Sequence, residues 1–130
     1  MVEEFPTLRV LVVDDERLIR WSIAETLAHL GHTVIEAENG AEAVRALTNP
    51  VEPIDAVFLD YRLPDSDDLR LLATIRRLSP RAPVILMTAY GSPEVTSGAL
   101  ELGVYQVMGK PFDLHDLQPL LLKACSAVAG

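Results

Sequence analysis

Short apolar runs alternate along the chain with longer segments in which apolar residues recur every three or four positions. Five runs rich in β-branched residues have the pattern of strands and cover Leu8–Val13, Thr33–Ala37, Ile54–Leu59, Val84–Met87 and Val104–Met108. The first and fourth are almost continuously apolar, which is typical of strands covered on both faces of a sheet. Gln106 interrupts the last run, which favours a place at the edge of the sheet.

Helices are predicted between these runs. The segment after the first run has an apolar face that stops at Gly31 and consists of Ile19, Ile23, Leu27 and Leu30. The segment after the third run has a similar face that stops before Pro80 and consists of Leu71, Leu72, Ile75 and Leu78. Asn39 is suited to cap a helix, and Ser92-Pro93 has the sequence of a cap followed by a first helical residue.

Pro119 limits where the fifth helix begins. A proline in a helix interior costs about 3 kcal/mol, whereas the first turn tolerates it. Asp113 and Asp116 are both suited to open this helix. We expect the helix proper to begin near Asp116, because that start puts Pro119 in the first turn.

The strict alternation of strands and helices predicts the fold. Five such units imply a parallel sheet with right-handed crossovers and helices on both faces. We expect residues 1–130 to form one α/β domain. Ligands of such sheets bind beyond the carboxyl ends of the strands, so the residues at those ends are the candidates for a site.

Chemically active residues stand where four of these runs end, namely Asp14, Asp15, Asp60, Thr88 and Lys110. Two carboxylates about 4 Å apart repel by roughly 4 kcal/mol at an effective dielectric near 20. Three in one cleft must therefore raise a pKa, take up a cation, or both. Hard oxygen ligands suit Mg²⁺, and a carboxylate is a nucleophile that forms aspartyl phosphate. Hydroxyl and ammonium groups are suitable donors to phosphoryl oxygens.

Four motifs are highly specific in their order and spacing: Val12–Glu16 (VVDDE), Asp60–Pro64 (DYRLP), Met87–Ala89 (MTA) and Lys110–Phe112 (KPF). Together they resemble the receiver domain of two-component response regulators, over nearly the whole chain from Val10 to about Ala124. The residues of these motifs are most similar to those of receivers attached to enhancer-binding transcription activators. The resemblance implies a flavodoxin-like, doubly wound five-stranded parallel sheet of order 2-1-3-4-5 with five helices.

The resemblance also implies a metal-dependent phosphoacceptor. Asp60 would accept a phosphoryl group from the phosphohistidine of a sensor histidine kinase or a phosphotransfer protein. Asp15 would bind Mg²⁺ (or Mn²⁺) directly and Asp14 largely through water. Asp60 itself and the backbone carbonyl of Arg62 would complete the protein ligands. The domain would be a regulatory phosphoacceptor that assists its own phosphorylation and dephosphorylation, and not an enzyme acting on a separate substrate.

Phosphorylation is expected to act as a switch. Lys110, the hydroxyl of Thr88 and the backbone of Ala89 would bind the phosphoryl group, and the Lys110–Pro111 bond resembles the family's cis peptide. Thr88 would move toward the phosphoryl group and change the face formed by the fourth helix, fifth strand and fifth helix. That face would contact an output domain outside this chain or a second receiver.

The chain departs from the family pattern at two positions. Val107 stands three residues before the lysine, where the family usually has the aromatic partner of the switch threonine. Tyr105 falls on the same face of the strand and is either an ordinary edge residue or a substitute. Asp68 replaces the usual glycine after Pro64, so we expect a local backbone adjustment in which Asp68 caps the third helix.

Arg62 and Tyr90 occupy the positions two residues beyond the phosphoacceptor and two beyond the threonine. In the family these positions control how fast the phosphoryl group is lost. Our hypothesis is that both side chains shield the acyl phosphate from water, the alternative being that they are solvated loop residues.

Composition argues against several other kinds of binding site and cellular location. The formal net charge of −8 argues against direct binding to nucleic acid. Cys125 is the only cysteine and cannot form an internal disulfide, and His29, His32 and His115 show no zinc-like grouping. No apolar run has the length of a membrane span, and Met1–Pro6 lacks the features of a secretion signal, so we expect a cytoplasmic location.

Two other functions fit parts of the sequence. A haloacid-dehalogenase-like phosphatase also uses a strand-end aspartate, but it places the nucleophile on the first strand and a carboxylate where this chain has Arg62. A degenerate receiver that serves as a constitutive docking module would have lost an acid or the lysine, and this chain keeps them all.

Overall fold

The computed structural model describes residues 7–48, 51–89 and 91–129. Five strands run in the order β1 (Arg9–Val13), β2 (Thr33–Ala37), β3 (Ala56–Asp60), β4 (Val84–Thr88) and β5 (Gln106–Gly109). The helices are α1 (Arg17–His29), α2 (Gly40–Thr48), α3 (Arg70–Leu78), α4 (Pro93–Glu101) and α5 (Leu117–Ala129), the last preceded by a 3-10 turn, η1 (Leu114–Asp116). Among the described residues, no helix is both long enough and apolar enough to span a bilayer.

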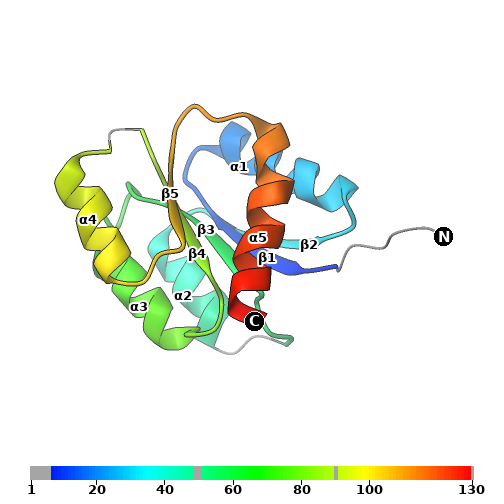
Figure 1. Ribbon diagram of the computed structural model, residues 1–130, viewed down its shortest axis with the longest axis horizontal. Helices are drawn as coiled ribbons and strands as arrows, with labels where there is room; N and C mark the ends of the chain where they lie inside the picture. The colour runs from blue at the N-terminus through cyan, green and yellow to red at the C-terminus, as the bar shows by residue number, and fades with distance from the viewer. Residues whose placement is uncertain (1–6, 49–50, 90, 130) are drawn as a thin grey trace.

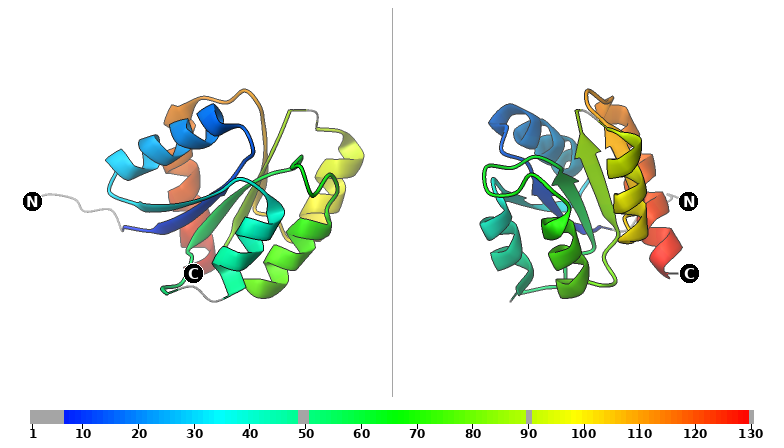
Figure 2. Two further views of the ribbon diagram at one scale, coloured as in Figure 1. Left: turned by 180° about the vertical axis from the view of Figure 1, so that it is seen from behind. Right: turned by 90° about the vertical axis from the view of Figure 1, so that its left-hand side faces the viewer.

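All strand pairs are parallel and the sheet has the order β2-β1-β3-β4-β5. Helices α1 and α5 cover one face and α2, α3 and α4 cover the other, which gives three layers (Figures 1 and 2). The predicted class, connectivity and strand order are therefore confirmed. After β1 the chain adds β2 on one side of it, and it then crosses to add β3 on the other side. The topological switch point therefore lies at the carboxyl ends of β1 and β3.

The sheet divides the core into two apolar layers. On one side Leu11, Leu59 and Leu86 pack with residues of α2 and α3, and on the other Phe58 and Ile85 pack with residues of α1 and α5. Every residue of β3 and β4 is buried, because both faces of these central strands are covered. The uninterrupted apolar runs in the sequence follow from this arrangement.

The predicted helix starts are confirmed by their hydrogen bonds. The Asn39 side chain accepts the N–H of Glu42 at 2.8 Å, and Ser92 accepts the N–H of Val95 at 3.1 Å. Asp113 caps η1, so that α5 begins at Leu117 and Pro119 is its third residue. Proline is tolerated there because the first turn has no intrahelical acceptor for its missing N–H.

Several details of the predicted pattern are wrong, among them the start of β3, which is at Ala56 and not at Ile54. Leu30 and Leu78, which were expected on buried helix faces, are 48% and 38% exposed at the ends of α1 and α3. Strand β5 begins at Gln106 and not at Val104, because the Val104 N–H donates to the Ala99 carbonyl and so closes the end of α4. Leu30, Leu78 and Val104 lie where helices end, and the spacing of apolar residues alone does not show where a helix ends.

Candidate functional site

Three carboxylates meet at the carboxyl edge of the sheet. Asp14 and Asp15 follow β1, and Asp60 is the last residue of the neighbouring β3. One oxygen from each lies within 4.8 Å of the other two. Asp14 is fully buried and Asp60 is 7% exposed, whereas Asp15 is exposed. The cluster is therefore anchored inside the protein and open to solvent on one side.

Each polar group of Asp14 has a partner. Its N–H donates to the Ala37 carbonyl at 3.1 Å, and its own carbonyl accepts from Arg20 Nη1 at 2.7 Å. In its carboxylate, Oδ1 accepts the N–H of Glu16 at 2.9 Å and Oδ2 accepts the ammonium of Lys110 at 2.7 Å. A buried charge is costly unless its polar atoms are hydrogen-bonded. These bonds hold the Asp14 carboxylate in one orientation.

Lys110, which directly follows β5, is the cation within this cluster. Its Nζ lies 2.7 Å from Asp14, 3.4 Å from Asp60 Oδ2 and 3.9 Å from Glu16. Burial by itself lowers the pKa of the ammonium, but the hydrogen bond and charge of Asp14, with the weaker effect of Asp60, raise it overall. Lys110 therefore remains charged, and its peptide bond to Pro111 is cis.

The carboxyl of Asp60 has an unusually high proton affinity. Burial, and then the negative charge of Asp14, raise its pKa from 3.8 to about 6, although Lys110 and the N–H of Arg62 act in the opposite direction. Another positive charge would relieve the same repulsion. Hard oxygen donors that repel one another fit a Mg²⁺ ion, which typically binds through one or two carboxylates and keeps several waters.

A family model described as the response regulator receiver domain matches residues 10–121. The chain belongs to this family. The DNA-binding transcriptional regulator NtrC of Escherichia coli K12 is 38% identical over 117 residues, which are 90% of this chain and 24% of that protein. The receiver thus spans about a quarter of the length of this curated relative. The expected likeness to receivers of transcription activators is confirmed.

Solved structures agree with this result. A receiver domain protein from Methanospirillum hungatei superposes with a TM-score of 0.89 at 27% identity, over 95% of this chain and 98% of that one. A response regulator from Burkholderia pseudomallei, solved with a phosphorylated aspartic acid, a calcium ion and citrate, has a TM-score of 0.81 at 27% identity and covers 94% of this chain and 71% of that one. The receiver therefore functions in two-component signal transduction, where phosphorylation is the general function of the family.

Both alternative functions fit less well. The family model and the solved structures identify a receiver, which is a regulatory fold. The exposed Arg62 stands where the phosphatase would require a second carboxylate. The docking-module alternative is not favoured, because Asp14, Asp15, Asp60 and Lys110 are all present and lie together.

The other expected site residues lie around the same edge. Thr88 ends β4 and is 4% exposed, and Ala89 follows it in an exposed position. The Thr88 carbonyl accepts the backbone N–H of Lys110 at 2.9 Å, which ties the ends of β4 and β5 together. Arg62 is exposed, and Tyr90 lies outside the described residues.

The departures from the family pattern occupy ordinary positions. Val107 is partly buried in the layer that faces α2, α3 and α4, and Tyr105 is 36% exposed just before β5. No described residue other than glycine has a positive φ, so Asp68 keeps a common backbone conformation. Its carboxylate accepts the N–H of Arg70 at 2.9 Å, but the N-cap of α3 is Leu69, so the expectation that Asp68 itself caps the third helix is wrong.

Two contacts of the site loops have no counterpart in the sequence motifs. Asp65, in the loop after Asp60, accepts the N–H groups of Gly40 at 2.8 Å and Ala41 at 3.0 Å. The bond from Gly40 is the main cause that lowers the pKa of Asp65. The second is the bond from Arg20 to the Asp14 carbonyl. Both connect residues whose proximity depends on how the helices pack against the sheet, and no local sequence signal reveals them.

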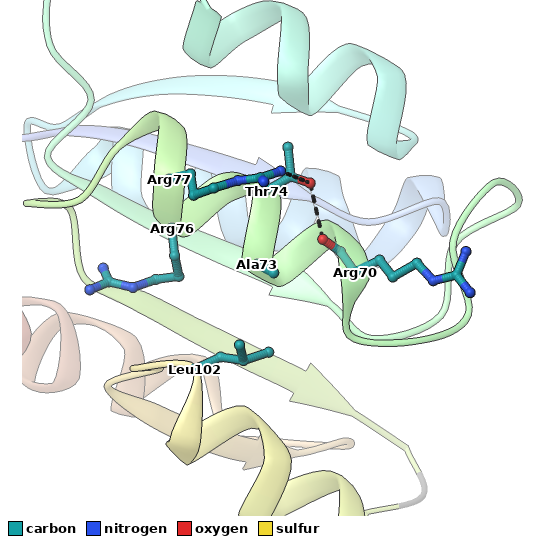
Figure 3. A pocket seen from close by; sticks show the side chains of 6 residues that line it. All are labelled: Arg70, Ala73, Thr74, Arg76, Arg77 and Leu102. Atoms are coloured by element: carbon teal, nitrogen blue, oxygen red, sulfur yellow. Dashed lines mark hydrogen bonds between the residues drawn. The ribbon is translucent and has the colours of Figure 1, made fainter.

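A shallow hollow elsewhere on the receiver is not part of this site. It lies against α3 and is lined by Arg70, Ala73, Thr74, Arg76, Arg77 and Leu102 (Figure 3). Thr74 donates to the Arg70 carbonyl at 3.1 Å and accepts from Arg77 at 3.4 Å. No carboxylate lines the hollow, so it lacks the groups that meet at the sheet edge.

Proposed function

We propose that Asp60 is the phosphoacceptor and takes a phosphoryl group from the phosphohistidine of a sensor histidine kinase or a phosphotransfer protein. The observation that carries the proposal is the environment of its carboxylate. One carboxylate oxygen each of Asp60, Asp14 and Asp15 lies within 4.8 Å of the other two, and Asp60 Oδ2 lies 3.4 Å from the ammonium of Lys110. A nucleophile, candidate metal ligands and a fixed cation thus meet at one solvent-accessible point.

The chemistry follows from these groups. An Asp60 oxygen attacks phosphorus, the bond from phosphorus to the donor's imidazole nitrogen breaks, and the imidazole leaves with that electron pair. Asp14, Asp15, Asp60 and the Arg62 carbonyl would hold Mg²⁺ (or Mn²⁺), which supplies positive charge for the phosphoryl oxygens. Lys110 would neutralise a second oxygen, and the Thr88 hydroxyl with the N–H of Ala89 would donate to the third. Because its pKa is about 6, Asp60 is mostly ionised at neutral pH.

Phosphorylation becomes a signal when two conformations interact differently with the added charge of about −1.5 to −2. Lys110 and Thr88 supply that difference, and coupling energies of about 1–3 kcal/mol shift populations several-fold or more. The responding face would be α4, β5 and α5, where Leu100 and Tyr105 are exposed. It would contact an output domain or a second receiver, in the cytoplasm. Leu18 and Trp21 of α1 are exposed directly after the acidic turn, where they would contact the protein that donates the phosphoryl group.

Intact-protein mass spectrometry tests the acceptor. After incubation with acetyl phosphate, the wild type is expected to gain one phosphoryl group only when Mg²⁺ is present, and hydroxylamine should remove it. Asp60→Asn should gain none, and Asp67→Asn, which alters an exposed aspartate of the same loop, should behave as the wild type. A Mg²⁺-independent adduct, or one that persists in Asp60→Asn, would contradict the proposal.

The same adduct can be followed over time to test the role of Arg62. This side chain is exposed two residues beyond Asp60, where it would limit the access of water to the acyl phosphate. We expect Arg62→Ala to shorten the half-life of the adduct by about 3-fold, which corresponds to roughly 0.7 kcal/mol in the barrier to hydrolysis. An adduct that lasts equally long or longer in Arg62→Ala would show that the side chain does not shield it.

A further inference from the structure

The guanidinium of Arg20 lies against the turn that carries Asp14 and Asp15. Its Nη1 donates to the Asp14 carbonyl at 2.7 Å, and its Nε lies 3.0 Å from a carboxylate oxygen of Glu36. The Arg20 side chain is only 13% exposed. Arg20 is thus largely withdrawn from solvent, whereas the Glu36 side chain is 45% exposed. The proposed phosphoryl transfer assigns no role to either charged residue.

The fold brings these residues to one side of the sheet. Arg20 is in the first turn of α1, where its N–H donates to the Glu16 carbonyl at 2.9 Å. Helical side chains tilt toward the helix N-terminus, so Arg20 reaches back to the end of β1. Glu36 is on the edge strand β2, two residues after Val34, which packs in the layer that α1 and α5 cover. Strand alternation therefore directs Glu36 to the same side.

We propose that Arg20, oriented by Glu36, is a positioning residue that holds the turn between β1 and α1 in the conformation that presents Asp14 and Asp15 to the divalent cation. The inference rests on the proposed function, because it concerns the same metal site. Asp14 is clamped from two directions, since its N–H bonds to Ala37 of β2 and its carbonyl bonds to Arg20. Asp15 is the next residue, so its direction depends on the same clamp.

The geometry requires a guanidinium. Arginine presents several donors in a rigid planar fork and can serve a carbonyl and a carboxylate at once. A lysine at this position keeps the positive charge, but its single ammonium on a flexible chain cannot reproduce both contacts with fixed geometry. Mg²⁺ demands near-ideal octahedral ligands, so a small loss of order in the turn is expected to weaken its binding.

A Mg²⁺ titration followed by ¹⁵N NMR of the turn amides tests the inference on the full chain. Arg20→Lys is expected to raise the Mg²⁺ dissociation constant by about 10-fold, as is usual when residues behind metal ligands are changed. Glu36→Gln should raise it less, by roughly 3-fold, because the amide still accepts one hydrogen bond. Arg17→Lys is the matched control: the same change on the same helix at an exposed position, with an unchanged constant expected.

Phosphorylation by acetyl phosphate provides a second readout. In Arg20→Lys the Mg²⁺ concentration for half-maximal rate should rise in step with the dissociation constant, and the rate at saturating Mg²⁺ should stay within about 2-fold of wild type. The variant with both Arg20→Lys and Glu36→Gln should bind Mg²⁺ no more weakly than Arg20→Lys alone, because the two residues act as one unit.

Unchanged Mg²⁺ affinity in Arg20→Lys would overturn the inference, even if its thermal midpoint falls, because the contact would then serve stability alone. Equal weakening in Arg17→Lys would overturn it as well, since the effect would not be specific to the fork. Failure of the proposed function has a different signature, namely a wild type that binds Mg²⁺ but forms no adduct at Asp60. The titration still decides the role of Arg20 in that case.

Discussion

Replacing Lys110 by methionine is expected to lower the free energy of unfolding by about 3 kcal/mol in buffer without divalent cations. The ammonium is the hydrogen-bond partner of Asp14 Oδ2 at 2.7 Å, and the Asp14 side chain is fully buried. Without it, the buried Asp14 carboxylate lies beside Asp60 and, among the described residues, keeps the Glu16 N–H as its remaining hydrogen-bond donor. Urea unfolding followed by circular dichroism at pH 7 measures the loss.

Lys123→Met is the matched control, because this lysine is exposed on α5 and the same substitution there should change the free energy by less than about 0.5 kcal/mol. Mg²⁺ should restore part of the stability of Lys110→Met, since it returns positive charge to the three carboxylates. If Lys110→Met were as stable as the wild type without Mg²⁺, the ion pair could not be what makes the buried charge tolerable.

Asp60→Asn is expected to change stability in the opposite direction, with a gain of about 2 kcal/mol at pH 7 without divalent cations. The pKa of Asp60 is raised from 3.8 to about 6 by burial and by Asp14, so the ionised form is disfavoured in the folded protein. The full shift corresponds to about 3 kcal/mol, and screening by water on the open side of the cluster reduces it. Asparagine keeps the shape and removes the charge.

The pH dependence has a definite sign. The folded protein binds the Asp60 proton more tightly than the unfolded chain, so the wild type should lose stability relative to Asp60→Asn as pH rises from about 3.8 to about 6. Above that range the difference should be constant. Asp67→Asn, at an exposed position, should show no such trend. A gap between wild type and Asp60→Asn that narrows as pH rises would contradict this account.

Much of the fold follows from local sequence patterns. Strand β2 has the predicted bounds, Thr33–Ala37, and β4 differs by one residue, because runs of β-branched residues between polar turns leave little choice. The carboxylates at the ends of β1 and β3 were predicted to meet, since parallel neighbours present their ends at one edge. The strand order came from the resemblance to receivers and not from periodicity.

The supporting contacts of the site were not predictable in this way. Arg20 and Glu36 are 16 positions apart, and Asp65 and Gly40 are 25 apart. Each pair meets only because a helix or loop packs at a particular angle on the sheet. Charged residues on a helix are usually solvated, so Arg20 gave no signal that distinguished it from the exposed Arg17. Similarly, the exposure of Leu30 and Leu78 depends on where α1 and α3 end.

The ion pair between Asp14 and Lys110 also bears on how the chain becomes functional during synthesis. Its two residues are separated by 96 positions, so it joins the first strand to the last. A nascent chain folds from its N-terminus, and until β5 has left the ribosome the acidic cluster lacks its internal counterion. The acidic site is therefore expected to be completed only at a late stage of folding, when β5 has joined the sheet. Truncated translation products that end before Lys110 would lack this counterion.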